Sequence, residues 1–316
     1  MFSSSNQTGA ALRAAVGWVL TTLIVCNAPI AQANDRKLEF VEIAPGIYVH
    51  YGKHEEMSVG NFGDIANIGF IIGTESVAVI DPGGSPRIGT AMRAAIRELT
   101  DLPISHVILT HIHPDHIFGG SAFADVEHIV AHQNFSRALA QRGDFYRDGY
   151  SALFFDSDTP TSLRPTVAVA DELRIELGGR SLSVQAHRTA HTDNDLSVFD
   201  RSTRTLWASD LVFAQRIPSL DGSLTGWLKV MEDLAMLQAV LVIPGHGLAD
   251  SWSTVAQQQR RYLTLLLRET RKFIAQNKRL SVAVDSIAAA ERENWRLFDS
   301  HHRGNVTKAY TELEWE

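Results

Sequence analysis

The chain has 316 residues, of which 45% are hydrophobic and 21% are charged, a composition typical of a globular protein with a substantial core. Its formal net charge is -7, and Lys and Arg do not gather into a cluster. Nucleic acid is therefore excluded as a partner, because binding to a phosphate backbone depends mainly on clustered cations.

The first 33 residues have the composition of an export signal. Arg13 is their only charged residue, residues 14–30 form an apolar stretch, and Ala31-Gln32-Ala33 offers small residues for cleavage. We expect residues 1–33 to be a signal peptide that is cleaved after Ala33, which makes the mature protein periplasmic or secreted. The alternative is an uncleaved membrane anchor, because the apolar stretch is nearly long enough to span a bilayer.

The single cysteine, Cys26, lies inside this N-terminal segment. A mature chain without it has no thiol and no disulfide, so its stability must come from its core. Any metal ligand must then be His, Asp or Glu.

Residues 34–316 begin with strand patterns and continue with a helix. Four short β-branched or alternating runs predict strands at residues 40–43, 47–50, 65–72 and 76–80. Apolar residues at helical spacing then predict a helix over Pro86–Leu99, which leads into a buried strand, His106–Leu109. A short strand over 127–130 and a helix to Leu139 follow. Residues 143–165 lack a clear period, and we expect a long surface excursion there.

The second half of the chain shows the same order of predicted elements as the first: several strands, then a helix and a further strand. Four further strand signals lie at residues 173–177, 182–186, 196–199 and 205–208. A helix near 226–237, a strand over 240–243 and long helices from Ser253 come after them. No linker or low-complexity segment interrupts this order, so we predict one domain, residues 34–316, in which two βα halves pack sheet against sheet and the C-terminal helices complete the chain.

The loop after the strand His106–Leu109 carries four potential metal ligands within six residues, His111, His113, Asp115 and His116. Residues two apart in extended backbone point the same way, so His111 and His113 can face one cation. Pro114 redirects the chain, which sends the next two donors toward a neighbouring position. Imidazole and carboxylate suit zinc, and also iron or manganese.

Three further donors stand where a strand meets a loop. His191 precedes the strand at Leu196, Asp210 follows the strand that ends at Ala208, and His246 follows the strand over 240–243. Each donor alone is weak evidence, because a solitary His or Asp at a strand end is usually a turn residue. The four elements in this order reinforce one another.

This order resembles the metallo-β-lactamase superfamily, whose signature is a His-x-His-x-Asp-His loop followed by a His, an Asp and a last His. The resemblance implies an α/β layered fold, the αββα sandwich, and a site for two divalent metal ions. It implies one ion held by His111, His113 and His191, a second held by Asp115, His116 and His246, and Asp210 as the bridge. It also implies that Asp81 orients a ligand histidine.

Such a site supplies a nucleophile at neutral pH, because two divalent cations that share a water lower its pKa to about 7. We take the ions to be zinc. Asp115 could both ligate a metal and orient the water, so it is our candidate catalytic residue. The function expected is hydrolysis of a small ester, thioester, lactone or lactam.

Two features narrow the choice within the family. Antibiotic-hydrolysing members usually lack an acidic bridging residue, and several have Cys there, whereas this chain has Asp210 and no cysteine in its mature part. Both features argue against a dedicated β-lactamase. The nearer resemblance is to exported quinoprotein relay system zinc metallohydrolases, relatives of a sulfur-oxidation-associated protein. It rests on the signal segment, on Gly226-Trp227-Leu228 and on the C-terminal segments 302–306 and 309–314. It implies a place in a quinoprotein-linked oxidation pathway.

Two alternatives from other classes stay open. One is a metal-dependent oxidoreductase similar to sulfur dioxygenases, which use a single iron. The other is a non-catalytic accessory or binding protein that keeps the old site to hold a ligand.

Phe213, Arg216 and Trp227 lie between the ligands along the chain, and we expect them to line the substrate pocket. We assign no ligand role to the other histidines. His187 is interpreted as a strand-edge residue, and His301 and His302 as solvated or helix-packing residues, because adjacent helical residues diverge around the axis. The rest lack ligand spacing: His50, His54, His106, His128 and His132.

Overall fold

The computed structural model describes residues 37–153 and 163–316. The predicted signal peptide, residues 1–33, lies outside this part, as do residues 154–162 of the predicted surface excursion. Among the described residues, none of the helices combines the length and the apolar character that crossing a membrane needs.

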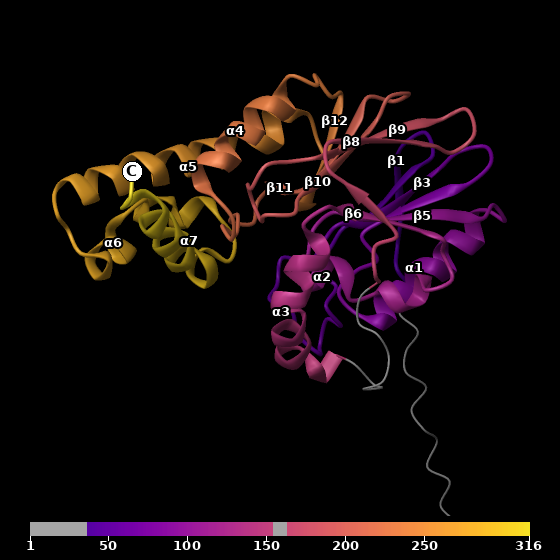
Figure 1. Ribbon diagram of the computed structural model, residues 1–316, viewed down its shortest axis with the longest axis horizontal. Coiled ribbons are helices and arrows are strands. Elements are labelled where there is room, and N and C mark those ends of the chain that lie inside the picture. The colour runs from indigo at the N-terminus through magenta and orange to yellow at the C-terminus, as the bar shows by residue number, and fades with distance from the viewer. Residues whose placement is uncertain (1–36, 154–162) are drawn as a thin grey trace, which may run out of the picture. The chain divides into compact units, whose positions relative to one another are not determined.

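Two β-sheets form the centre of the fold (Figure 1). The first sheet has seven strands in the order β1-β2-β3-β4-β5-β6-β7, and its strands from β4 to β7 run parallel. These strands are β1 (Val41–Ala44), β2 (Ile47–His50), β3 (Ile68–Ile72), β4 (Val77–Ile80), β5 (Ile104–Leu109), β6 (His128–His132) and β7 (Val167–Val169).

The second sheet has five strands in the order β12-β11-β10-β9-β8, and only β11 and β12 are parallel. Its strands are β8 (Glu172–Glu176), β9 (Ser181–Ala186), β10 (Leu196–Asp200), β11 (Thr205–Phe213) and β12 (Leu241–His246). The two sheets face each other across a core of aliphatic side chains, to which Trp207 adds the largest ring.

Helices cover the outer faces of both sheets. On the first sheet lie α1 (Pro86–Leu99), α2 (Pro114–Ile117) and α3 (Phe135–Gly149), and on the second lie α4 (Leu224–Ala235) and α5 (Trp252–Ala275). Beyond them, α7 (Phe298–Leu313) packs on α5, and α6 (Leu280–Ser286) packs on α7. Three short 3-10 helices complete the elements of the described part, at Gly120–Phe123, Ser151–Leu153 and Ala289–Asn294. The fold is the αββα sandwich that the sequence predicted.

The central strands are buried on both faces, which is why their sequences are apolar without interruption. In β4, Val77 and Val79 point to the core under α1, whereas Ala78 and Ile80 point between the sheets. Helix α1 begins at Pro86 because Ser85 caps it: the Ser85 hydroxyl accepts a hydrogen bond from the amide of Ile88. The β4-α1-β5 crossover then brings the carboxyl ends of two buried strands side by side.

Three sequence expectations differ from the structure. Strand β3 begins at Ile68 rather than at residue 65, since the Asn67 side chain instead donates to carbonyls of the β12 segment. Residues 143–149 continue helix α3 instead of starting an irregular excursion. Strand β11 does not end at Ala208 but runs on to Phe213, through a register shift around Ser209, whose φ is 47°.

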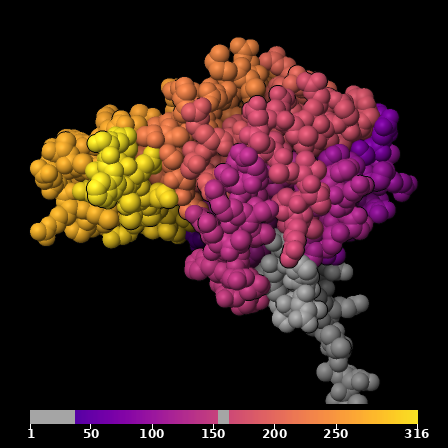
Figure 2. All heavy atoms as spheres, in the orientation of Figure 1, coloured from indigo at the N-terminus to yellow at the C-terminus, as the bar shows by residue number. Residues whose placement is uncertain are grey.

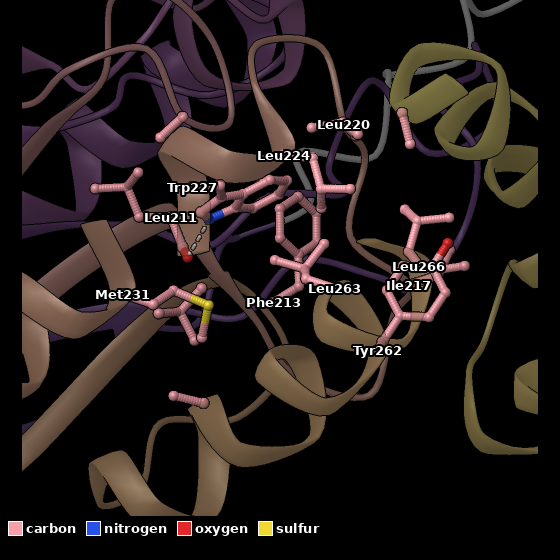
Figure 3. Close-up of a cluster of buried hydrophobic side chains, with 14 of the residues drawn as sticks. Leu211, Phe213, Ile217, Leu220, Leu224, Trp227, Met231, Tyr262, Leu263 and Leu266 are labelled. Carbon is pink, nitrogen blue, oxygen red and sulfur yellow. Dashed lines mark hydrogen bonds between the residues drawn. The ribbon is translucent and has the colours of Figure 1, made fainter. Parts of the chain in front are cut away.

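The C-terminal helices form a lobe that projects beyond the sheets (Figures 1 and 2). Its core is continuous with the outer face of the second sheet and holds Phe213, Trp227 and Tyr262 among its largest buried rings (Figure 3). Helix α7 is tied to α4 by Glu312, whose carboxylate accepts from the amides of Leu224 and Thr225 at the start of α4. An anion at this end also matches the helix dipole.

Replacing Glu312 with Gln is expected to lower the free energy of unfolding by about 1–2 kcal/mol, because charge-assisted hydrogen bonds to a helix N-terminus are lost. Chemical denaturation of the variant and the wild type measures this. Glu314→Gln, an exposed position at the end of the same helix, is the control. Equal destabilisation by the two changes would contradict the capping role.

His106 and His128 are register partners on β5 and β6, and their rings stack with centroids 4.8 Å apart. Burial lowers the pKa of His106 to about 4, and the facing His128 imidazole acts in the same direction. In the unfolded chain His106 takes up its proton near its ordinary pKa of about 6.5. Stability is therefore lost as the pH falls from about 6.5 toward 4, because the unfolded chain binds more protons than the folded one.

We expect His106→Gln to reduce the stability difference between about pH 7 and pH 5 by on the order of 1 kcal/mol, a figure discounted for the ring's partial exposure. Comparing this difference between variant and wild type removes any pH effect that the two proteins share. Denaturation curves at both pH values provide the measurement, and an unchanged difference would show that the stacked pair does not titrate as described.

Candidate metal centre

The seven predicted metal ligands meet in one place, at the carboxyl ends of strands from both sheets. The loop after β5 brings His111 to His116, the loop before β10 brings His191, and β11 and β12 bring Asp210 and His246. The donor atoms fall into two groups whose members all lie within 4.8 Å of one another. The first is His111, His113, His191 and Asp210, and the second is Asp115, His116 and His246.

In the first group, three imidazole nitrogens point at one another. Nδ1 of His113 lies 3.1 Å from Nε2 of His111 and 2.9 Å from Nε2 of His191. The rings of these three residues stand nearly perpendicular to one another, with centroids 4.7–4.8 Å apart. This is how imidazoles are arranged when their lone pairs converge on a common point.

The hydrogen bonds on the far side of each ring decide which nitrogens carry protons. Nδ1 of His191 lies 2.7 Å from the Ser219 carbonyl, which only accepts, so this nitrogen holds the proton and Nε2 is bare. The Thr110 hydroxyl donates to Asp81 and therefore accepts from Nδ1 of His111 at 3.0 Å, which leaves Nε2 of His111 bare as well.

The ring of His113 has the reverse orientation, with Nδ1 toward the other two histidines and Nε2 toward Asp221. The sequence analysis did not identify Asp221 as part of the site. Nε2 of His113 lies 3.2 Å from the carboxylate of Asp221, so the proton is on Nε2 and Nδ1 is the bare nitrogen. Asp221 also pairs with Arg142 of α3. Burial alone would raise the pKa of Asp221, but His113 and Arg142 outweigh it and hold that pKa well below its ordinary value.

Three bare nitrogens at hydrogen-bond distance, with no proton to share, repel one another unless a cation lies between them. The residues of this group therefore fit a divalent metal, and imidazole with carboxylate is a donor set that zinc, iron and manganese accept. Each ring is also held by a hydrogen bond outside the group, as ligand histidines commonly are.

The second group is built on the same principle. Nδ1 of His116 donates to Asp81 at 2.8 Å and Nδ1 of His246 donates to the Ile65 carbonyl at 2.7 Å, so both turn Nε2 inward, where a cation can replace any proton that it holds. The Asp115 carboxylate lies 3.7 Å from Nε2 of His116 and 3.5 Å from Nε2 of His246. Nε2 of His116 is buried without a hydrogen-bond partner in the described part.

Asp210 stands between the two groups, and each of its oxygens faces one of them. Oδ2 lies 3.3 Å from His191 and 3.7 Å from His111, whereas Oδ1 lies 3.1 Å from His116 and 3.5 Å from His246. A carboxylate placed in this way can hold two cations at once, which is the bridging position that the family resemblance implied.

The electrostatics of the centre follow from burial and from its own charges. Burial lowers the pKa of His191 to about 3, against the opposing effect of Asp210. Burial would raise the pKa of Asp210, but His116 and His246 hold it well below its ordinary value. For His116, burial would lower the pKa, but the carboxylates of Asp210, Asp115 and Asp81 outweigh it and raise that pKa well above its ordinary value. A divalent cation would take the place of the positive charge that these carboxylates attract.

Asp81 holds residues of both donor groups in place through hydrogen bonds to Thr110, which precedes His111, and to His116. It is fully buried and accepts from the amide and the hydroxyl of Thr110, each at 2.8 Å, as well as from His116. It reaches this position from a backbone with φ of 54°, directly after β4. This placement is the one expected of a residue that orients a ligand histidine.

Glycine is the only residue type that fits at position 245, beside Asp210. A Cβ atom on Gly245 would collide with Oδ1 of Asp210 and would lie 2.8 Å from the Asp210 amide nitrogen. The absence of a side chain in β12 thus allows β11 to bring the carboxylate between the two groups.

A cleft of about 300 Å³ opens onto the donors, and its lining tests the expected pocket residues. Phe213 and Arg216 both line it. Trp227 does not: its ring is fully buried behind His191, with centroids 5.2 Å apart, and its indole N–H donates to the Leu211 carbonyl (Figure 3). The expectation that Trp227 lines the pocket is therefore wrong, because the start of α4 packs inward.

His301 also lines the cleft, contrary to the expectation that it is only a solvated or helix-packing residue. Its neighbour His302 does pack within the C-terminal lobe, where it bonds to Tyr262 and to the Ile287 carbonyl. The two side chains diverge as expected, but the start of α7 directs His301 toward the metal centre, a contact that local spacing does not reveal.

The family model of the metallo-beta-lactamase superfamily matches residues 62–246, more than half of the chain. A linear primary-alkylsulfatase from Pseudomonas sp. (strain ATCC 19151) is 24% identical over 212 residues, which cover 55% of this chain and 40% of that protein. The chain therefore spans less than half of the length of this curated relative.

Solved structures share the fold. The stereoselective inverting sec-alkylsulfatase Pisa1 from Pseudomonas sp. superposes with a TM-score of 0.67 at 14% identity, covering 87% of this chain and 50% of that one. A metallo-beta-lactamase family protein from Thermus thermophilus gives a TM-score of 0.63 at 17% identity, covering 87% and 94%. A metallo-beta-lactamase from Pontibacter korlensis gives 0.55 at 19% identity, covering 69% and 94%.

The matched segment includes every residue of the metal centre, from the loop after β5 to the end of β12. The fold, the donor set and the family match together are those of a metal-dependent hydrolase. The chain belongs to the metallo-β-lactamase superfamily.

Proposed function

We propose that the protein is an exported hydrolase that binds two zinc ions and cleaves a small ester, thioester, lactone or lactam. The observation that carries this proposal is the position of Asp210, whose two oxygens face two separate groups of inward-facing imidazole nitrogens. One cation would satisfy only one group and leave buried lone pairs in the other, so the arrangement favours two cations.

When bound, the two ions would lower the pKa of a shared water and so supply a nucleophile at neutral pH. The chain's own residues would position the reactants. Asp115, which has one face toward His116 and His246 and lines the cleft, can accept a hydrogen bond from the attacking water and orient it. Phe213 stacks on His246 with an interplanar angle of 22° and shields this side from solvent.

Arg216 favours a substrate that carries negative charge. Its side chain is 5% exposed, it lines the cleft, and its Nε has no hydrogen-bond partner within the described part. The salt bridges of the described residues include none to Arg216, although a buried guanidinium normally has an anionic partner. An anionic group of the substrate would supply one.

Sulfate esters are the second candidate substrate class. The alkylsulfatase relatives are named for this reaction, and a buried guanidinium beside a metal centre suits a sulfate group as it suits a carboxylate. Export through the segment 1–33 and a link to a quinoprotein-dependent oxidation pathway are further parts of the proposal, which rest on the sequence alone.

Replacing Asp210 or His113 with Ala is expected to abolish turnover, by at least about 100-fold in kcat/KM, because either change removes donors from a preorganised centre. Metal analysis should find two zinc ions per wild-type chain and fewer in the variants, with unchanged circular dichroism. Wild-type turnover by either variant would refute the assigned site. One iron and no zinc per chain would favour the oxidoreductase alternative, and a metal-loaded protein inert toward all five substrate classes would favour an accessory role.

Gly245→Ala is expected to lower kcat/KM by about 100-fold, since the new methyl group must push Asp210 from its bridging position and small displacements of catalytic groups have effects of this size. Gly304→Ala is the matched control, because nothing lies within 4 Å of a Cβ placed there. Steady-state kinetics with zinc analysis of both variants is the test. Full activity in Gly245→Ala would mean that the carboxylate need not stand where the structure puts it.

A further inference from the structure

His301 joins the metal cleft from helix α7, outside the segment that the family model matches. The family signature therefore assigns it no role. Its side chain is 22% exposed, so it has both a buried contact with the cleft and access to solvent. Its Nε2 atom lies near two groups of opposite charge, which determines what it can do.

The two neighbours of Nε2 require different protonation states of this nitrogen. Oε1 of Glu56 lies 3.2 Å away and only accepts a hydrogen bond, so this contact requires a proton on Nε2. A terminal nitrogen of Arg216 lies 3.4 Å away and only donates, so that contact requires a bare Nε2. Nε2 can thus satisfy one neighbour when it is protonated and the other when it is not, and both forms have a partner in place.

The other titratable groups that line the cleft are committed elsewhere. His113, Asp115, Asp210 and His246 belong to the donor groups, and Asp221 is held between His113 and Arg142. Tyr146 and Tyr150 have a pKa that burial raises, which takes them further from neutrality. Of the described lining residues, His301 is the imidazole that is left to exchange a proton near neutral pH.

We propose that His301 donates a proton from Nε2 to the leaving group during hydrolysis and that Glu56 and Arg216 stabilise its protonated and neutral forms in turn. This inference rests on the proposed hydrolase function and adds the residue that completes the reaction.

In the step, water forms a new bond to the acyl carbon and releases one proton to solvent. The bond between that carbon and the leaving oxygen breaks with its electron pair on the oxygen, and His301 gives this oxygen a proton. His301 then regains a proton from solvent through its exposed edge.

The charges that face His301 fit this cycle. Burial lowers its pKa, Arg216 and His246 act in the same direction, and Glu56 and Asp115 oppose them. An anionic substrate group bound by Arg216 would offset that guanidinium, so protonation of His301 would become easier when substrate is present. The proton would then be available when the leaving group needs it.

Two acetate esters separate proton donation from a structural role. The alkoxide of benzyl acetate needs a proton to leave, whereas the phenolate of para-nitrophenyl acetate leaves without one. With the zinc-loaded full chain, His301→Gln should lower kcat/KM for benzyl acetate by about 100-fold and change it for para-nitrophenyl acetate by less than about three-fold. An equal loss on both esters, or no loss on either, would overturn the proposal.

A second measurement does not depend on turnover. In zinc-loaded protein with nitrogen-15 labelled histidine, NMR titration should show that Glu56→Gln lowers the pKa of His301 and that Arg216→Gln raises it. Glu55→Gln, the same charge change at the next exposed residue of that loop, should shift it less than either. An unchanged pKa in both test variants would overturn the proposal even in an active enzyme. If the wild type cleaves neither acetate, the proposed action on acyl esters fails. The NMR titration then tests by itself whether Glu56 and Arg216 control the protonation of His301.

Discussion

The metal centre depends on one constraint: five imidazoles each have one nitrogen hydrogen-bonded to an acceptor outside the two donor groups. Carbonyls of Ser219 and Ile65 tie His191 and His246, and carboxylates of Asp221 and Asp81 tie His113 and His116. The Thr110 hydroxyl ties His111. The other nitrogen of each ring is turned toward Asp210 and its neighbours, where the rings crowd together. Such an arrangement costs free energy in a buried site, and bound cations would remove that cost.

The two-sheet fold makes this arrangement possible because it brings the ends of distant strands together. Parallel strands β4 and β5 deliver Asp81 and the His111 loop, and parallel strands β11 and β12 deliver Asp210 and His246. Asn67 fastens the sheets to each other here, since its amide donates to the carbonyls of Pro244 and Gly247. The bulge at Ser209 and the missing side chain at Gly245 then bring the bridging carboxylate into line.

The sequence predicted the parts of this site that are encoded locally. Four donors in one short loop, and single donors at strand ends, are visible because strand periodicity places them at one edge of a sheet. Asp221 and His301 were missed for a physical reason: each acts through a partner far along the chain, His113 for the first and Glu56 for the second. Trp227 shows the reverse error, since proximity to the ligands along the chain placed it in the pocket, but an amphipathic helix buries its apolar face.

Two different parts of the chain form the metal centre and the cleft that would receive the substrate. The donors lie within the segment 62–246 and are held by hydrogen bonds within that segment, so the metal-binding geometry depends on the sandwich alone. The cleft above them is closed by pieces from elsewhere: Glu56 precedes the segment and His301 follows it. Changes in these outer pieces can alter the charge and width of the cleft without disturbing the tautomers of the ligands. Substrate choice in this protein is therefore expected to depend on the loop before β3, on Arg216 and on helix α7 more than on the metal ligands.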